Sequence, residues 1–308
     1  MKKFLFSLLL SLSLILMFLS CGQQREKSIK IRFDNRKELN TSENGPGKII
    51  RAAVSAMISP EENYVYYSRI FNYIAQNIGK EITFKQRKTY QEVNELLRLN
   101  KLDFAFICSG AYVEAREKFE AEIIAIPKIR DRTYYQAYII ANSDSGVKSF
   151  EDLEGKDFAF TDPLSNTGYL YPSYLLRKID RSEADFFSRI IYTYAHDYSI
   201  QAVERGLVTG ASVDSLIFDY LRRKAPRRVA HVRIIKKSEP FGMPPVVVNP
   251  RIEPELKRKL QSILLKMSHD PVGKEILSHL EIDSFVPGKD DDYDSIRAMR
   301  NLLKEPRW

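Results

Sequence analysis

Residues 158–172 read FAFTDPLSNTGYLYP, and this stretch decides the fold class of the chain. Its apolar beginning predicts a strand over residues 157–161, which ends at the turn Asp162-Pro163. The run Ser165-Asn166-Thr167-Gly168 then predicts the start of a helix that continues to about Ile179. A strand, a tight turn and a helix in this order form the repeating unit of an α/β fold.

The same alternation of short apolar strands and helices extends from this unit in both directions along the chain. Further strands are predicted over residues 49–54, 82–84, 103–108, 135–141, 190–194, 211–213, 232–236 and 246–248. Upstream, Ser59-Pro60-Glu61-Glu62 predicts the start of a helix with a capping box. Short helices are expected over residues 147–153, 199–206 and 215–223. The pattern favours an α/β class over separate all-α and all-β parts.

The composition is that of an ordinary folded protein and excludes several other classes. The 308 residues are 44% apolar and 29% charged, which fits neither a disordered chain nor a polytopic membrane protein. Two cysteines are too few for a disulfide scaffold or a four-thiolate zinc site. His231, His269 and His279 lack metal-ligand spacing, and no recognised nucleophile or phosphate-loop motif occurs. The sequence therefore predicts no catalytic residue, no metal and no cofactor.

The N-terminus has the pattern of an export signal. Lys2 and Lys3 precede an apolar run from Phe4 to Leu19, and FLSCG at 18–22 resembles a bacterial lipobox. We expect a lipoprotein signal peptide over residues 1–20, with a lipid attached to the thiol of Cys21 after cleavage. The alternative is an uncleaved N-terminal anchor. Either outcome places the folded part on the periplasmic or cell-surface side of a bacterial membrane.

Part of the formal net charge of +8 belongs to the N-terminal region. Lys2 and Lys3 contribute two charges, and the six basic and four acidic residues of 22–47 contribute two more. That polar stretch ends in Asn44-Gly45-Pro46-Gly47, so we expect residues 21–47 to form a flexible tether beside an anionic membrane. The folded part is then only mildly basic, and no nucleic-acid partner is expected.

Polar residues follow several predicted strands, where the N-terminus of the next helix favours an anion. Ser165, Asn166 and Thr167 offer hydroxyl and amide groups without net charge; the alternative is an ordinary helix cap. His196 lies in the loop before the helix that begins near Ser199, and its imidazole can donate to an oxyanion. The alternative is a surface histidine beside an Asp197 N-cap.

Three further residues are weaker candidates on the sequence alone. Asp214 ends a predicted strand, so it either accepts from a ligand donor or caps the next helix. Tyr90 begins a helix after a strand and Tyr134 precedes the strand over 135–141, but 17 tyrosines make any single one weak evidence. Cys108 is expected to be a small buried apolar residue and not a nucleophile.

Seven short motifs follow one another along the chain from Lys88 onward. They read KTY at 88–90, LDFA at 102–105, DLEGK at 152–156, FAFTDPLSNTGYLYP at 158–172, HD at 196–197, AVERG at 202–206 and DYDSIR at 292–297. In this order and spacing, from Ile49 to about Leu303, the chain resembles the solute-binding proteins of phosphonate ABC importers.

The resemblance implies a type II periplasmic-binding-protein fold, with two α/β lobes that close on a ligand in the cleft between them. Lobe 1 would comprise residues 48–140 and 239–308, lobe 2 residues 141–238, with crossing segments near 138–142 and 236–242. The strands over 232–236 and 246–248 would return the chain to lobe 1. The residues expected to bind the ligand are Tyr90, Tyr134, Ser165, Asn166, Thr167, His196 and Asp214.

Two departures from the family pattern bear on the ligand. Asn166 stands where the family has a hydroxyl residue, and Phe241-Gly242-Met243-Pro244-Pro245 has no carboxylate where aminoalkylphosphonate binders place a second one. The ligand therefore stays open among alkylphosphonate, phosphite, phosphate and other small oxyanions. A wrong ligand is rejected through the donors and acceptors that it leaves unpaired.

The function expected from these observations is that of an extracytoplasmic solute-binding lipoprotein. As a lipid-anchored monomer it would capture a phosphonate-like oxyanion by lobe closure and deliver it to an ABC permease in the membrane. The alternative is a ligand-sensing module that signals to a membrane-bound kinase. An enzyme on this fold would need a nucleophile–base pair or a metal cluster in the cleft, and the sequence predicts neither.

Overall fold

The computed structural model describes residues 49–305. The predicted signal peptide, Cys21 and the tether over residues 21–47 therefore lie outside the described residues. None of the helices within residues 49–305 is both long enough and apolar enough to span a bilayer.

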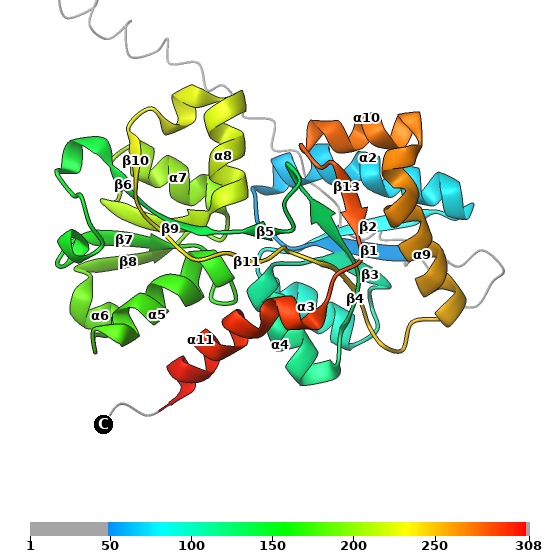
Figure 1. Ribbon diagram of the computed structural model, residues 1–308, viewed down its shortest axis with the longest axis horizontal. Coiled ribbons are helices and arrows are strands. Elements are labelled where there is room, and N and C mark those ends of the chain that lie inside the picture. The colour runs from blue at the N-terminus through cyan, green and yellow to red at the C-terminus, as the bar shows by residue number, and fades with distance from the viewer. Residues whose placement is uncertain (1–48, 306–308) are drawn as a thin grey trace, which may run out of the picture. The chain divides into compact units, whose positions relative to one another are not determined.

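Four of the six strands of the first sheet come from residues 50–128 (Figure 1). Its strands, in spatial order, are β13 (Ser284–Val286), β4 (Glu122–Lys128), β12 (Val246–Val248), β3 (Phe104–Phe106), β1 (Ile50–Val54) and β2 (Ile82–Gln86). The strands β2, β1 and β3 run parallel, so their carboxyl ends lie at one edge of the sheet. The helices packed with it are α2 (Pro60–Ile78), α3 (Tyr90–Arg98), α4 (Ser109–Phe119), α9 (Pro254–Lys266) and α10 (Pro271–His279). We call this sheet and its helices lobe 1.

The second sheet is built from the middle of the chain. Its strands, in spatial order, are β10 (Val232–Lys237), β6 (Ala137–Asn142), β9 (Gly210–Asp214), β7 (Asp157–Phe160) and β8 (Arg189–Tyr192). The strands β9, β7 and β8 run parallel, and β6 and β10 are antiparallel additions at one side. The helices packed with it are α5 (Tyr171–Lys178), α6 (Glu183–Phe186), α7 (His196–Glu204) and α8 (Ser215–Lys224). We call this sheet and its helices lobe 2.

Two short antiparallel strands join the lobes: β5 (Tyr134–Tyr135) pairs with β11 (Phe241–Gly242). Figure 1 shows this pair between the two sheets. The last helix, α11 (Asp294–Lys304), packs against α4 of lobe 1 and also against α5 of lobe 2. The chain therefore crosses from lobe 1 to lobe 2 through β5 and returns through β11, and α11 contacts both lobes.

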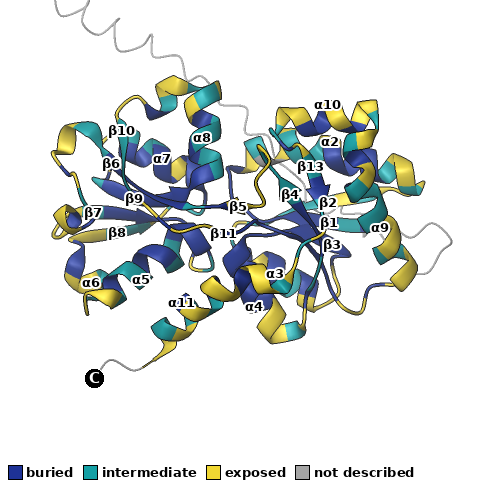
Figure 2. Cartoon of the chain, in the orientation of Figure 1, coloured by how far each residue is buried: buried dark blue, intermediate teal, exposed yellow. Residues whose placement is uncertain are grey.

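The inner strands of both sheets are buried, the edge strands β2, β8 and β10 are partly exposed, and many exposed residues lie on the outer faces of the helices (Figure 2). One apolar cluster extends from lobe 1 into the face of the second sheet under α5, and it includes Phe104, Phe158 and Leu176. The opposite face of the second sheet forms a separate cluster around Ile140 and Val213. A continuous core of this kind ties the position of α5 to that of lobe 1.

Several local expectations differ from the structure at the junction of the lobes. The predicted boundary between residues 140 and 141 falls inside β6, because this whole strand pairs with lobe 2. The strand predicted over 232–236 does not return to lobe 1; as β10 it pairs with β6. In both cases, hydrogen bonding to the edge of a nearby sheet determines which lobe the strand belongs to. The apolar pattern of a strand does not indicate the strand with which it pairs.

Four of the predicted helices differ from the structure at or near their N-terminus. The helix α2 begins at Pro60 as expected, but the Ser59 side chain does not cap it, because it hydrogen-bonds to Asp197, as does the backbone N–H of Ser59 at 2.9 Å from Asp197 Oδ1. The helix α7 begins at His196 and not near Ser199. The helix predicted from Ser165 begins with a π-helical turn over 166–170 before α5. The predicted helix over 147–153 is reduced to a 3-10 turn over 151–153.

Candidate ligand-binding site

The carboxyl ends of the parallel strands in the two lobes bring most of the predicted site residues together. Ser55, Tyr90 and Cys108 follow β1, β2 and β3 in lobe 1. The Ser165–Thr167 run follows β7, His196 follows β8, and Asp214 ends β9 in lobe 2. In open α/β sheets this edge is where ligands bind, because each strand there leads into a helix N-terminus.

Hydrogen bonds between the lobes show that these two edges face one another. The backbone N–H of His196 donates to the carbonyl oxygen of Met57 at 3.0 Å. The backbone N–H of Tyr90 donates to Asp162 Oδ2 at 3.0 Å, and burial raises the pKa of that carboxyl group. The two lobes are therefore in direct contact at the predicted site in this structure.

The Ser165–Thr167 run forms the lobe 2 side of the site and is fully buried. Ser165 Oγ accepts from the backbone N–H of Gly168 at 2.9 Å, so this hydroxyl caps the π-helical turn. Asn166 Nδ2 donates to the phenol oxygen of Tyr135 at 3.2 Å. Thr167 Oγ1 and Asn166 Oδ1 have no partner among the described residues. The cap and the ligand interpretations of this run are thus compatible, because different atoms serve each.

His196 is fully buried, and burial lowers its pKa to about 3, so the imidazole is neutral. The backbone N–H of Asp214 donates to His196 Nδ1 at 3.2 Å. A nitrogen that accepts from an N–H carries no proton in the neutral ring, so the proton is on Nε2. Nε2 lies 3.5 Å from Ser165 Oγ. His196 is therefore a neutral donor directed at the Ser165–Thr167 run and not a surface histidine.

Lobe 1 contributes two buried hydroxyl groups without a partner among the described residues: Ser55 Oγ and the phenol of Tyr90. Burial is the main cause of the raised pKa of Tyr90, with further contributions from Cys108, Asp162, Asp214 and Tyr135, which places the phenol near all four. Buried hydroxyl groups normally have a hydrogen-bond partner. Unpaired hydroxyl groups from both lobes at one edge are what a ligand with several acceptor atoms would satisfy.

Asp214 is buried, and burial raises its pKa to about 7. Its Oδ1 accepts from the backbone N–H of Leu216 at 2.7 Å, so the side chain caps α8. Its charge also contributes to the raised pKa values of Tyr67, Tyr90 and Tyr135. The side chain thus fulfils the capping interpretation and also lies next to the predicted site.

Close packing across the lobes depends on Gly110 at the start of α4. A Cβ atom at this position would lie 2.5 Å from the carbonyl oxygen of Leu164 and 2.8 Å from the backbone nitrogen of Asn166. Both distances are too short for a real side chain, so only glycine allows α4 to approach the turn of lobe 2 this closely. This glycine lets the N-terminus of α4 take part in the site.

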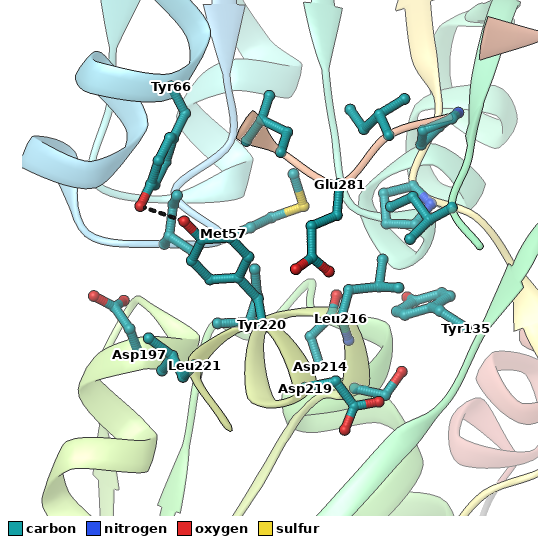
Figure 3. Close-up of a pocket in the computed structure, with 18 of the residues that line it drawn as sticks. Met57, Tyr66, Tyr135, Asp197, Asp214, Leu216, Asp219, Tyr220, Leu221 and Glu281 are labelled. Atoms are coloured by element: carbon teal, nitrogen blue, oxygen red, sulfur yellow. Dashed lines mark hydrogen bonds between the residues drawn. The ribbon is translucent and has the colours of Figure 1, made fainter. Parts of the chain in front are cut away.

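A cavity of about 240 Å³ opens beside these buried groups, between α2, α8 and the segment before β13 (Figure 3). Asp214 and Tyr134 are the predicted site residues that line it. Figure 3 shows the carboxylate of Glu281 directed into this space and the hydrogen bond between Tyr66 and Tyr220 at one side. The fully buried Ser165–Thr167 run, His196 and Tyr90 lie behind the cavity and do not line it.

The two neighbouring tyrosines of β5 lie in different surroundings. Tyr134 is 42% exposed, and the guanidinium of Arg132 lies over its ring. Tyr135 is buried and accepts from Asn166. Adjacent residues of a strand point to opposite sides, and a shift of one residue exchanges them. Neither Tyr135 nor Ser55 could be identified from the sequence, because both are common residue types outside any motif.

The described residues hold no cluster of three or more histidine, cysteine, aspartate or glutamate side chains that could bind a metal. Two carboxyl groups belong to this region: Asp162 Oδ1 accepts from the backbone N–H of Leu164 at 2.8 Å, and Asp214 is the residue whose backbone N–H donates to His196. Neutral donors are therefore the groups that the buried part of the site offers to an anion.

Comparisons with known proteins identify the family of this chain. A family model described as "ABC transporter, phosphonate, periplasmic substrate-binding protein" matches residues 52–293. The phosphonates-binding periplasmic protein of Escherichia coli is 26% identical over 235 residues, which are 75% of this chain and 69% of that protein. The phosphate-import protein PhnD of Mycolicibacterium smegmatis is 24% identical over 283 residues, which are 85% of this chain and 88% of that protein.

A solved structure shows the same fold. It is the crystal structure of a binding protein component of an ABC phosphonate transporter from Pseudomonas aeruginosa, with a TM-score of 0.77 and 24% sequence identity. The match covers 82% of this chain and 85% of that one. Two mixed sheets joined by crossing strands, as found here, are thus the type II periplasmic-binding-protein fold. With the family model covering most of the chain, this protein belongs to the periplasmic substrate-binding proteins of phosphonate ABC transporters, which bind their ligands and are not enzymes.

Proposed function

We propose that this protein captures a phosphonate-like oxyanion, with the phosphorus group held by neutral donors from both lobes, and delivers it to its ABC permease. The observation that carries the proposal is the set of buried, unpaired hydroxyl groups at the carboxyl edges of both sheets, those of Ser55, Tyr90 and Thr167. The helix α4 and the π-helical turn both begin at these edges, so their N-terminal N–H groups are further candidate donors.

The predicted ligand contacts fit this proposal with one addition. Ser165, Asn166, Thr167, His196 and Tyr90 form the buried oxyanion site, with Asp214 next to it. Tyr134 lies at the mouth of the cavity, and Tyr135 is the neighbour that contacts Asn166. Because each oxygen of a phosphonate accepts more than one hydrogen bond, several donors converging on one point favour this chemistry over a singly charged ligand with few acceptors.

Capture would occur by a hinge motion about β5 and β11. The hydrogen bonds from His196 to Met57 and from Tyr90 to Asp162 join the lobes only when the cleft is closed. Opening breaks them and exposes the buried hydroxyl groups to water. This gives the ligand an entry path, and closure then removes the ligand from solvent.

The test is calorimetry with the full chain purified in mild detergent, against methylphosphonate, aminoethylphosphonate, phosphite, phosphate and sulfate. We expect at least one phosphorus oxyanion to bind with a micromolar or lower Kd and to raise the thermal midpoint. A double variant, Ser165→Ala with Thr167→Ala, should lose most of this binding, since each unmade hydrogen bond to a charged group costs roughly 1–3 kcal/mol.

The matched control is the double variant Ser278→Ala with Ser149→Ala, which removes two hydroxyl groups that do not line the cavity and are not among the predicted site residues. Its affinity should equal that of the unaltered protein. Binding of no oxyanion by the unaltered protein, or equal binding by the Ser165/Thr167 variant, would reject the site assignment.

We also propose that the chain is anchored to the membrane through a lipid on Cys21 and acts as a monomer. The support is the N-terminal pattern of Lys2, Lys3, the apolar run and the FLSCG sequence. A tether between Cys21 and the first strand would leave the folded part free to reach the permease.

A further inference from the structure

The cavity of about 240 Å³ is larger than a simple oxyanion site requires. A water molecule occupies about 30 Å³ of liquid, so the cavity has room for a group of several non-hydrogen atoms. The oxyanion itself would sit among the buried hydroxyl groups behind it. A methyl group or a hydrogen atom on phosphorus would leave most of this space unfilled.

Three lining residues connect the cavity to the buried oxyanion site. The carbonyl of Met57 accepts from the backbone N–H of His196 at 3.0 Å. The phenol oxygen of Tyr135 accepts from Asn166 Nδ2 at 3.2 Å, and the backbone N–H of Asp214 donates to His196 Nδ1 at 3.2 Å. The floor of the cavity is therefore in hydrogen-bond contact with the groups that would hold the oxyanion, so one ligand can occupy both.

The lining of the cavity is rich in apolar and aromatic side chains. Residues of lobe 1, lobe 2 and the crossing strand all contribute, among them Met57, Tyr67, Phe106, Tyr135, Leu216 and Phe285. Tyr67 and Phe106 contact each other with ring centroids 5.1 Å apart. A pocket with this lining gains most from burying apolar surface, and its flat rings suit an aromatic group.

Most charged residues at the rim form ion pairs, and the guanidinium of Arg132 lies over the ring of Tyr134. Glu281, which points into the space in Figure 3, forms ion pairs with Arg223 and, at 3.2 Å, with Arg130. Arg228 forms an ion pair with Glu62 at 3.1 Å. The carboxylates of Glu62, Asp197, Asp219 and Glu281 thus each face an arginine, so these four offer no unpaired negative charge to an amine on the ligand.

Resting on the proposed function, we infer that the ligand of this protein is a phosphonate whose substituent on phosphorus is a ring-sized apolar or aromatic group that fills this cavity. The oxyanion supplies the polar contacts, and the substituent supplies apolar burial. Asp214 is a carboxyl group in the lining of the cavity, and the amine of an amine-bearing ligand would bind to it. The apolar lining opposite Asp214 favours a substituent without an amine.

The test compares phenylphosphonate and benzylphosphonate with methylphosphonate, aminoethylphosphonate and phosphate, by calorimetry on the full chain in mild detergent. We expect the two aromatic phosphonates to bind at least tenfold more tightly than methylphosphonate. The variant Leu216→Trp places a large side chain in the cavity and should reduce this preference at least tenfold.

Leu207→Trp is the matched control, because Leu207 is 61% exposed and does not line the cavity. It should leave every Kd unchanged. Leu216→Phe is a milder filling variant if Leu216→Trp does not give a cooperative thermal transition, and the ligand series on the unaltered protein decides the inference without either.

The outcomes separate the inference from the proposed function. Equal or tighter binding of methylphosphonate, aminoethylphosphonate or phosphate by the unaltered protein overturns the inference and leaves the proposed function intact. Binding of no phosphorus oxyanion overturns both. An aromatic preference that survives in Leu216→Trp also overturns the inference, because the substituent would then lie elsewhere.

Discussion

At the scale of single residues, the site depends on which buried polar atoms have partners and which do not. Thr161 and Thr167 show the contrast. Thr161 Oγ1 lies 3.1 Å from His196 Nδ1 and 3.3 Å from Ser199 Oγ, whereas Thr167 Oγ1 has no partner among the described residues. The first hydroxyl stabilises the fold, and the second lowers stability, a cost that the proposed ligand contact would explain.

Thr167→Val should therefore stabilise the ligand-free protein while weakening ligand binding. The valine has nearly the same shape and removes an unsatisfied buried hydroxyl, so the free energy of unfolding should rise by about 1 kcal/mol. Urea denaturation without ligand measures this. Thr161→Val is the control and should lower the free energy by about 1–2 kcal/mol. Equal destabilisation by both variants would mean that Thr167 has a structural partner.

Asp214 predicts a pH dependence of stability. Burial raises its pKa from 3.8 to about 7, so the folded state holds a proton that the unfolded state releases between these values. The stabilisation is complete below pH 3.8 and is lost as the pH rises through 7. At about 1.4 kcal/mol per pKa unit, the loss is roughly 4 kcal/mol at most.

Asp214→Asn keeps an oxygen for the Leu216 N–H but has no such titration. Denaturant unfolding of both proteins without ligand, at pH 4.5 and at pH 8, gives the comparison. The variant should gain stability relative to the unaltered protein as the pH rises. His196 titrates in both proteins and cancels in the difference. A difference that does not change with pH would mean that Asp214 is ionised in the folded state without cost.

At the scale of elements, the contact between α4 and the π-helical turn holds the lobes together at the site. Gly110→Ala favours the helix α4 itself, because alanine is the better helix former. Its Cβ cannot be accommodated against Leu164 and Asn166, however. We expect the ligand affinity to fall more than tenfold and the radius of gyration in small-angle X-ray scattering to increase, with unchanged helical circular dichroism. Unchanged affinity would show that this contact is not needed for closure.

The helix α8 offers a matched pair of arginines for testing lobe closure. Arg223 forms its ion pair with Glu281 across the lobes, whereas Arg222 pairs with Asp219 on its own helix at 2.9 Å. Arg223→Met should raise the ligand dissociation rate about threefold to tenfold, since a partly exposed ion pair is worth about 1 kcal/mol. Arg222→Met should leave it unchanged. Stopped-flow fluorescence measures both rates, and equal rates in the two variants would contradict a role of Glu281 in closure.

At the scale of the whole molecule, the predicted anchor can be tested by the two cysteines of the chain. Cys21→Ser should abolish incorporation of a labelled fatty acid, whereas Cys108→Ser should not, because Cys108 is buried in lobe 1. Fractionation of cells after labelling gives the readout. Label retained by Cys21→Ser would exclude lipidation at this residue.

The α/β class and most strands could be predicted from the sequence, because alternating apolar segments and breaker residues are local signals. The edge position of Ser165, His196 and Asp214 followed from the same signals, since parallel strands end at one edge. The pairing of β10 with β6 could not be predicted, because an apolar strand fits several neighbours. The missing Ser59 cap has a similar cause: Asp197, 138 residues away, binds its backbone.

The sequence alone determined the class of fold, the family resemblance and the chemical type of the site: hydroxyl, amide and imidazole donors at strand ends. Only the tertiary structure decided which atoms are left unpaired, that Tyr135 and not Tyr134 contacts Asn166, and that an apolar cavity adjoins the site. Donor types are a property of residues and can be read along a chain. Burial, pairing and cavity volume depend on segments far apart in the chain, here the two lobes, and exist only when these meet.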